Sequence, residues 1–265
     1  MKQAVIRPLV QADLRRVRAV FADVDGTLTH DGRLTSTVLR AIEWLVAHRV
    51  KLVLVSGRPS GWGECWAREL PVSGVIVENG GLYYLPDSGG RLKKVYPQPP
   101  GLRRKNRARL ERIVAAAIRT VHGARLSGDS LATEVDLAID YAEDARLGPP
   151  AADRLEAFLR ARGVTAVRSS VHVNCWIGEF DKCSAVRDFI AREWKLKLRA
   201  ADPRFVYVGD SFNDAPMFAA FSLSIGVANV LDILDRLAAW PKFVTRAREG
   251  RGFCELVDAI ARARR

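Results

Sequence analysis

The chain has few cysteines and no long apolar run. Its four cysteines, Cys65, Cys175, Cys183 and Cys254, form no Cys-x-x-Cys pair, and its four histidines are scattered. The sequence therefore predicts neither a zinc ribbon nor a disulfide framework. No apolar stretch approaches the roughly 20 residues that a membrane helix needs, and residues 1–18 lack the apolar core of a signal peptide. A cytoplasmic protein with no membrane partner is expected.

The charge is unbalanced, with a formal net charge of +12. Such a charge can attract anionic substrates or nucleic acid, or it can reflect arginine on solvated faces. Residues 91–125 hold eleven Lys or Arg and one acid, whereas residues 126–145 hold six acids and no Lys or Arg. Neighbouring blocks of opposite sign can neutralise each other within one small domain. The basic block lacks the interleaved aromatics of a single-strand binder, so nucleic acid is not the favoured partner.

Two clusters of acidic side chains follow two apolar runs. Asp23 and Asp25 come where the run 18–24 meets a glycine turn, and Asp210 and Asp214 follow the run 205–208. Carboxylates crowded together repel each other unless a proton or a cation offsets their charge. Hard oxygen ligands in a small set suit Mg²⁺, which is the cofactor that we predict.

The chain alternates strand and helix patterns, which is typical of an α/β fold. Expected strands and helices are separated by a proline-rich segment, 97–101, after which a second unit begins. The prediction is a Rossmann-like, doubly wound parallel-sheet core (1–97 and 180–265) with an inserted α/β cap domain (98–179). Core strands are expected at 18–24, 51–55, 74–77, 205–208, 223–227 and 242–244, with a hairpin at 82–85 and 92–96. Core helices are expected at 35–48, 61–69, 182–194, 215–221, 231–238 and 252–264. Within the second unit, we expect a helix through 110–121, a strand over 134–141, a helix at 151–161 and a strand at 171–177.

Polar residues follow the ends of four predicted core strands. In open α/β sheets, ligands bind outside the carboxyl ends of the strands. Asp23, Ser56, Asn79 and Asp210 each come just after such an end. The pattern therefore predicts that these residues converge on one site.

Several further segments join the two acidic clusters in a recognisable order. They are Val-Ser-Gly-Arg (55–58), Glu-Asn-Gly-Gly (78–81), Asp181-Lys182, Gly-Val-Ala-Asn (226–229) and Val244-Thr245. Together they resemble the haloacid dehalogenase superfamily of aspartyl-phosphate phosphatases, in its subfamily IIB or Cof-like branch with a large α/β cap. The resemblance spans nearly the whole chain, and four ordered motifs at strand ends or helix starts are far more specific than one Asp-x-Asp.

The resemblance implies phosphoryl transfer from a phosphomonoester to Asp23, followed by hydrolysis of the aspartyl phosphate. Asp25 would act as acid and then base, and Lys182 and Ser56 would meet the transferring oxygens. Mg²⁺ would be held by the carboxylates of Asp23 and Asp210 and by the Asp25 carbonyl. Asn213 and Asp214 would orient these ligands. Further phosphate or substrate contacts are expected from Gly26, Thr27, Gly57 and Asn79.

Most of these residues also have a purely structural interpretation. Asp-x-Asp-Gly is a common turn, Lys182 could be a solvated lysine of a first helical turn, and Asp214 could be a helix N-cap. Ser56 could cap the turn into the next helix, and Asn79 could be a turn residue before two glycines.

The cap is expected to read the leaving group. Alternation along 171–177 places His172 and Asn174 on one face and Val173 and Cys175 on the other. In capped relatives the polar face looks onto the site, so Arg168, His172 and Asn174 are predicted to contact the substrate.

The leading function is a Mg²⁺-dependent phosphatase for a small phosphorylated metabolite, such as a sugar phosphate, phosphoglycolate or a phosphorylated glycoside. One alternative is a nucleotide or nucleic-acid-end phosphatase, which the basic charge would assist and which would show a steep salt dependence. Another is a non-catalytic phosphate-binding regulatory module. The sequence does not name the substrate, the oligomeric state or the role of the N-terminal segment 1–16.

Overall fold

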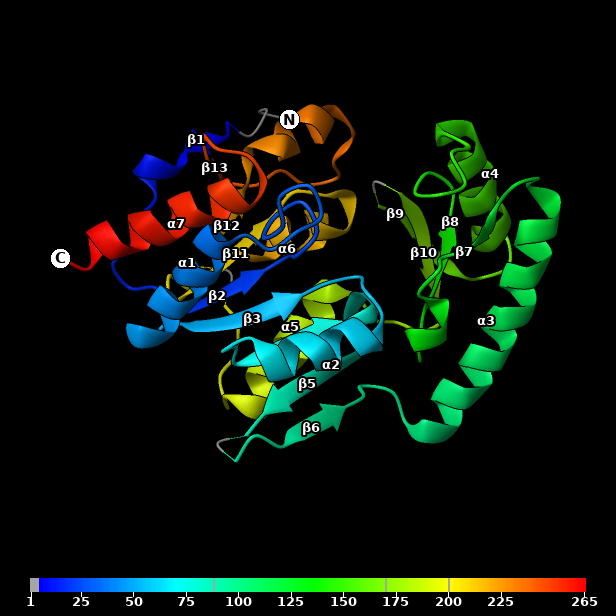
Figure 1. The fold of residues 1–265 in the computed structure, drawn as a ribbon, viewed down its shortest axis with the longest axis horizontal. Coiled ribbons are helices and arrows are strands. Elements are labelled where there is room, and N and C mark those ends of the chain that lie inside the picture. Colours follow the sequence, from blue (N-terminus) through cyan, green and yellow to red (C-terminus); the bar gives the residue numbers. More distant parts are fainter. Residues whose placement is uncertain (1–4, 88, 170, 200) are drawn as a thin grey trace.

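The computed structural model describes residues 5–87, 89–169, 171–199 and 201–265. It contains a nine-stranded sheet, in the order β1-β13-β12-β11-β2-β3-β4-β5-β6, and a separate four-stranded sheet, in the order β7-β8-β10-β9. In Figure 1, the larger sheet and its helices form the left part of the molecule, and the smaller sheet and its helices form the right part. The predicted combination of a mostly parallel α/β core with an inserted α/β cap is confirmed.

The core sheet is parallel except at one edge, where β4, β5 and β6 pair antiparallel. Short apolar runs bounded by glycine and polar residues form its central strands, as expected for strands buried on both faces. The strands are β1 (Arg7–Pro8), β2 (Ala19–Ala22), β3 (Lys51–Val55), β4 (Gly74–Val77), β5 (Leu82–Pro86), β6 (Leu92–Val95), β11 (Phe205–Gly209), β12 (Leu223–Gly226) and β13 (Phe243–Val244).

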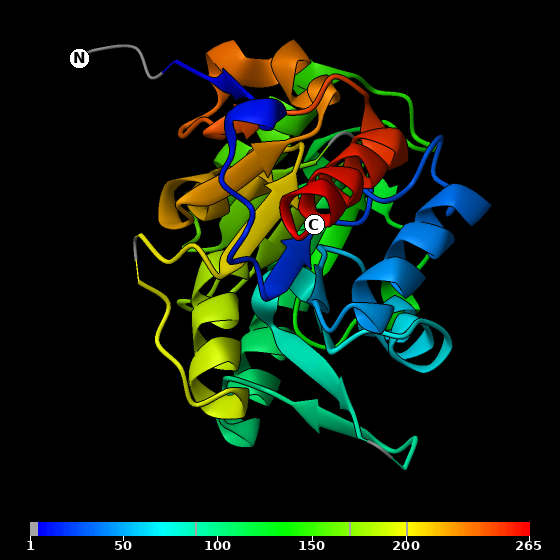
Figure 2. The same ribbon diagram turned by 90° about the vertical axis from the view of Figure 1, so that its left-hand side faces the viewer.

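Helices cover both faces of the core sheet. Helices α1 (Ser36–Ala47), α2 (Ser60–Glu69) and α7 (Glu249–Ala263) bury their apolar stripes on one face, and α5 (Lys182–Glu193) and α6 (Ala215–Ala220) on the other. Figure 2, viewed from the end of the core opposite the cap, shows α7 and α1 on one side of the sheet and α5 on the other. Parallel strands therefore lie between two helical layers, and all their carboxyl ends meet at one edge.

The cap sheet packs one face against two helices. Its strands are β7 (Arg125–Leu126), β8 (Leu137–Asp140), β9 (Thr165–Arg168) and β10 (His172–Trp176), all antiparallel to their neighbours. Val173 and Cys175 join a cap core with residues of α3 (Pro100–Thr120) and α4 (Pro149–Arg160). The helices lie on the outer side of the cap, so the opposite face of the sheet is turned to the core domain (Figure 1).

Three local predictions were wrong. The helix expected at 231–238 begins earlier, at Ala228, and is a 3₁₀ helix that ends at Arg236. Helix α3 begins at Pro100, inside the segment expected to be a linker, because proline suits the first turn of a helix. The strand expected from residue 134 begins only at Leu137, since the backbone N–H groups of 134–136 bond to a core side chain instead.

The N-terminal segment, which sequence patterns left unassigned, adds strand β1 to the edge of the core sheet next to β13. Residues 1–4 of that segment, and Ser88 between the two strands of the expected hairpin, lie outside the described residues. No helix in the described part of the chain has both the length and the apolar character needed to cross a bilayer.

Candidate active site

The four polar residues expected at strand ends do meet at the carboxyl edge of the core sheet. Asp23 follows β2, Ser56 follows β3, Asn79 lies in a short 3₁₀ helix after β4, and Asp210 follows β11. Strands β2 and β11 are neighbours, and the Asp23 N–H donates to the carbonyl of Val208, 2.9 Å away. The sheet order thus brings side chains that are 187 positions apart in sequence to one place, as the geometry of open α/β sheets predicts.

Lys182 lies between two carboxylates in the interior of this site. Its ammonium group donates to Asp23 Oδ1 and Asp214 Oδ1, both at 2.7 Å, and to Asn213 Oδ1 at 3.2 Å. Lys182 is only 2% exposed, and it is the first residue of α5 after the N-cap Asp181. Burial alone would lower the pKa of Lys182, but Asp214 and Asp23 outweigh it and raise that pKa. The lysine is therefore a fixed positive charge and not a solvated first-turn residue.

Asp214 is saturated with hydrogen bonds from the protein. Besides Lys182, it accepts the hydroxyl of Tyr207 at 2.5 Å and the N–H groups of Asp210 and Ser211, both at 2.9 Å. Burial opposes ionisation of Asp214, but Lys182 and these donors hold its pKa below the usual range. Asp214 is thus a permanent anion that positions Lys182 and the 210–211 backbone.

Asp210 is held on both of its oxygens. Thr27 Oγ1 donates to Oδ1 at 2.9 Å, and Asn229 Nδ2 donates to Oδ2 at 2.7 Å. Burial, with the nearby Asp214, raises the pKa of Asp210 to about 7. Gly26 has a left-handed φ of 75°, and a Cβ there would lie 2.5 Å from Asp210 Oδ2. Glycine is therefore required for the 23–27 turn to approach Asp210 so closely.

The carboxylates fit a divalent cation. Oxygens of Asp23, Asp210 and Asp214 all lie within 4.8 Å of one another. Burial raises the pKa of Asp23 well above its ordinary value, and the neighbouring Asp214 and Asp210 raise it further against the opposing effect of Lys182. Because Asp214 is already fully engaged, Asp23 and Asp210 are the side chains that could hold the ion, and an ion would relieve their mutual repulsion.

Asp25 makes a contact that sequence analysis missed. The guanidinium of Arg58 donates from Nε to both carboxylate oxygens of Asp25, at 3.1 Å each, and from Nη2 to Oδ1 at 2.9 Å. The Asp25 side chain is 43% exposed, in contrast to the buried Asp23. Arg58 belongs to the Val-Ser-Gly-Arg segment, so the only available signal was that motif, which does not say where the arginine points.

Not all the expected phosphate contacts are arranged as predicted. The N–H of Gly26 donates to Thr29 Oγ1 at 3.0 Å, and the N–H of Thr27 donates to the carbonyl of Val24 at 3.3 Å. Both groups are thus used within the turn, and the Thr27 hydroxyl serves Asp210. Ser56 is fully buried and its hydroxyl accepts the N–H of Arg58 at 3.0 Å, as a turn-capping residue would.

Asn79 connects the site with the cap. Its Oδ1 accepts from Asn213 Nδ2 at 3.4 Å, and its Nδ2 donates to Asp136 Oδ2 at 3.0 Å. Next to it, the buried carboxylate of Glu78 accepts the N–H groups of Ser60 and of cap residues 134–136, at 2.6–3.1 Å. Glu78 and Asn79 both have positive φ values, 50° and 53°. This left-handed turn therefore docks the cap onto the core and presents Asn79 to the site.

On the cap, two of the three predicted residues face the core. His172 and Asn174 are nearly buried on the inner face of β10, and His172 Nε2 lies 2.8 Å from Glu143 Oε2. Arg168 is not brought to the site, because it pairs with Asp153 and Glu156 of α4 on the outer side. The prediction for Arg168 failed because the register of β9 places it on the same face as Ala166, which packs in the cap core.

Glu143 is a candidate that sequence analysis missed. The buried carboxylate of Asp140 accepts N–H groups from four successive residues, 142–145, at 2.8–3.1 Å, which fixes the loop that carries Glu143. A cavity of about 430 Å³ lies between cap and core; its lining includes Asn79, Val167, Trp176, Lys182, Phe212 and Asn213, but not His172, Asn174 or Glu143. It joins apolar walls to the polar groups of the site, as small-molecule pockets do.

Comparisons with known proteins agree with this geometry. The sequence family of haloacid dehalogenase-like hydrolases matches residues 20–93. Among curated proteins, no sequence matches the chain. A Thermoplasma acidophilum protein of known structure superposes with a TM-score of 0.70 at 20% identity, covering 92% of this chain and 98% of its own.

Two further solved structures are similar over most of their length. A phosphatase of the haloalkanoate superfamily from Bacteroides thetaiotaomicron has a TM-score of 0.63 at 17% identity, covering 93% of this chain and 96% of its own. The sucrose-phosphatase of Synechocystis has a TM-score of 0.66 at 15% identity, covering 93% and 98%. Residues 20–93 are therefore similar in sequence to haloacid dehalogenase-like hydrolases, and most of the chain, with its inserted cap sheet, shares the fold of these solved structures.

Proposed function

We propose that the chain is a Mg²⁺-dependent phosphatase that acts on a small phosphorylated metabolite through an aspartyl-phosphate intermediate. The observation that carries this proposal is the meeting of Asp23, Asp210 and Lys182 at one strand edge, with Asp25 beside them. A buried carboxylate with a fixed ammonium and a cation site is suited to attack phosphorus, since the approaching phosphate is itself an anion.

In the first step, the Asp23 carboxylate forms a bond to phosphorus while the bond from phosphorus to the leaving oxygen breaks. Asp25 gives its proton to that oxygen. In the second step, water attacks the phosphorus, gives a proton to Asp25 and releases Asp23 and inorganic phosphate. Lys182, the Ser56 hydroxyl and the N–H of Gly57 would meet the transferring oxygens.

Mg²⁺ would be held by the carboxylates of Asp23 and Asp210 and by the backbone carbonyl of Asp25. When bound, it supplies charge neutralisation and alignment of the phosphate. Asp214 and Asn213 fix Lys182, and Asn229 and Thr27 fix Asp210, so each ligand's orientation is set before substrate arrives.

The leaving group would bind between the cap and the core. His172, Asn174 and Glu143 offer hydrogen-bonding groups there, which suits a sugar phosphate, a phosphorylated glycoside or phosphoglycolate. One of the similar structures is a sucrose-phosphatase, which supports a sugar phosphate among these.

Phosphate release from a broad panel of phosphomonoesters, with and without Mg²⁺, tests the proposal. The wild type should turn over at least one sugar phosphate only when Mg²⁺ is present, and Asp23→Asn should abolish that turnover. A folded wild type that binds Mg²⁺ but hydrolyses no ester would instead favour a phosphate-binding module.

A further inference from the structure

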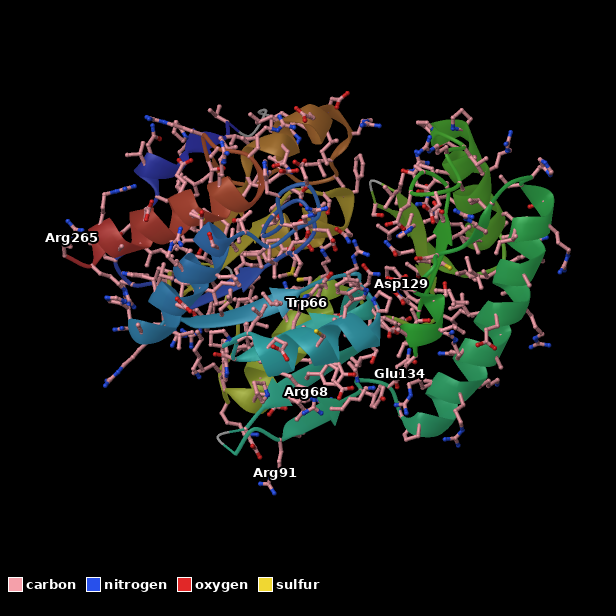
Figure 3. All side chains as sticks on the ribbon, viewed as in Figure 1. Trp66, Arg68, Arg91, Asp129, Glu134 and Arg265 are labelled. Atoms are coloured by element: carbon pink, nitrogen blue, oxygen red, sulfur yellow. The ribbon has the colours of Figure 1, made fainter. Side chains whose placement is uncertain are left out.

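Arg58 lies where the core and the cap approach each other. It follows β3 and precedes α2, and its side chain contacts a carboxylate from each domain. Nε and Nη2 bond to Asp25 of the core, while Nη1 lies 3.7 Å from Asp129 Oδ2 of the cap. Asp129 immediately precedes a short 3₁₀ helix, and Figure 3 shows it on the side of the cap that is turned to the core.

Asp129 is held in the orientation that Arg58 meets. Trp62 Nε1 donates to Asp129 Oδ2 at 3.1 Å, and the Ser127 hydroxyl donates to Oδ1 at 2.5 Å. The Trp62 ring also lies 5.4 Å from the guanidinium carbon of Arg58. The side chains of Arg58 and Asp129 are 28% and 26% exposed, so solvent screens their attraction only in part.

We propose that Arg58 is a positioning residue that couples closure of the cap to the orientation of Asp25. The inference rests on the proposed function, in which Asp25 moves the proton. Guanidinium is planar, with its donors in a fixed fork, so holding Nη1 near Asp129 also fixes the direction of Nε and Nη2. When the cap moves away, Arg58 loses the Asp129 contact and the plane that orients Asp25 is free to turn.

This arrangement would make catalysis depend on closure. Asp25 is 43% exposed, and Arg58 donates to both of its carboxylate oxygens, so Arg58 is the side chain that orients it. In this proposal, the closed cap would hold Asp25 toward the leaving oxygen and an open cap would leave it free to turn away, and misplacement of a catalytic group is costly in rate.

A double-mutant cycle tests the coupling in the full-length protein. Arg58→Lys keeps the charge but removes the fork, and Asp129→Asn keeps the shape but removes the cap carboxylate. We expect kcat to fall about tenfold in Arg58→Lys and about threefold in Asp129→Asn, with KM changed less than about twofold. The double variant should be no slower than Arg58→Lys alone. The proposal would be overturned if the losses in kcat of the two single variants multiplied in the double variant. An effect of Asp129→Asn on KM alone would also overturn it.

The same four proteins give a second readout that needs no substrate. Amide hydrogen exchange in residues 127–132 should be faster in both single variants and no faster in the double variant. Unchanged exchange in Arg58→Lys would refute the link to the cap even if turnover fell. If the wild type hydrolyses no ester, this exchange cycle still decides the Arg58 link, while the proposed function alone fails. Arg68→Lys and Glu64→Gln, an exposed pair on α2, are matched controls and should change neither readout.

Discussion

The two sides of the cleft are built differently. On the core side, Lys182 and Asp214 are buried and every charged atom of Asp214 has a partner within the protein. On the cap side, Glu143 is 43% exposed and its recorded side-chain partner is His172. The core side therefore has one arrangement that burial enforces, whereas the cap side keeps the Glu143 carboxylate available to a ligand. Under the proposed function, the core side would carry out the chemistry and the cap side would select the substrate.

The largest effect should come from the interior of the core side. Lys182→Met leaves the carboxylates of Asp23 and Asp214 buried without their shared cation. We expect a loss of about 3–5 kcal/mol in the free energy of unfolding, measured by urea denaturation, together with loss of phosphatase activity. Lys93→Met removes the exposed partner of Glu193 and should cost less than about 0.5 kcal/mol. Equal losses of unfolding free energy in the two variants would show that a buried ion pair and an exposed one contribute alike to stability.

A second prediction concerns the boundary between the two sides, where the buried Asp136 meets Asn79. Burial and the nearby Glu78 raise the pKa of Asp136 well above its ordinary value. The folded protein therefore holds this proton more tightly than the unfolded chain does. Its contribution to the free energy of unfolding is lost as the pH rises through the pKa of Asp136 in the folded protein.

Asp136→Asn should remove that loss, because the amide oxygen can still accept from Asn79. The Tm of the variant minus that of the wild type should increase between pH 5 and pH 8 in thermal scans. A difference that stays flat or decreases with pH would mean that Asp136 folds in its charged form.

Smaller effects are expected on the cap side. His172→Ala, Asn174→Ala and Glu143→Gln should each raise KM for the preferred ester a few-fold and change kcat little, because these groups are proposed to contact the leaving group only. Steady-state kinetics with the best ester of the panel would show this. A fall in kcat at unchanged KM would place these side chains in the chemical step instead.

The smallest effect is predicted for Arg168, whose side chain pairs with α4 on the outer side of the cap. Arg168→Gln should leave both kinetic constants unchanged and cost at most about 1 kcal/mol of stability. A raised KM would mean that the side chain leaves α4 and reaches the substrate in another position of the cap.

Sequence patterns were sufficient where one strand end determines a position. Apolar runs and the turn residues after them placed Asp23, Ser56, Asn79 and Asp210 correctly, because parallel strands bring their carboxyl ends together. Side-chain pairings between distant segments were not accessible in this way. The contacts of Arg58 with Asp25 and of Glu143 with His172 depend on rotamers and on how the cap docks, and local periodicity contains neither.

The same limit explains the errors in the elements. Residues 134–136 alternate like a strand, yet their N–H groups bond to the Glu78 carboxylate, 56 to 58 positions away. No strand is predicted from sequence patterns over Thr165–Arg168, so these patterns offer no basis for the face of β9 that Arg168 occupies, which the strand register decides.

The central claim is that Asp23 itself takes the phosphoryl group. It is tested most directly by mixing the protein with the best ester of the panel carrying ³²P in its phosphoryl group, quenching with acid within the first turnover, and mapping the label to a peptide. The account predicts label on the peptide that contains Asp23 in the wild type and none in Asp23→Asn. Turnover with label on another residue, or with no labelled protein at any time, would contradict it.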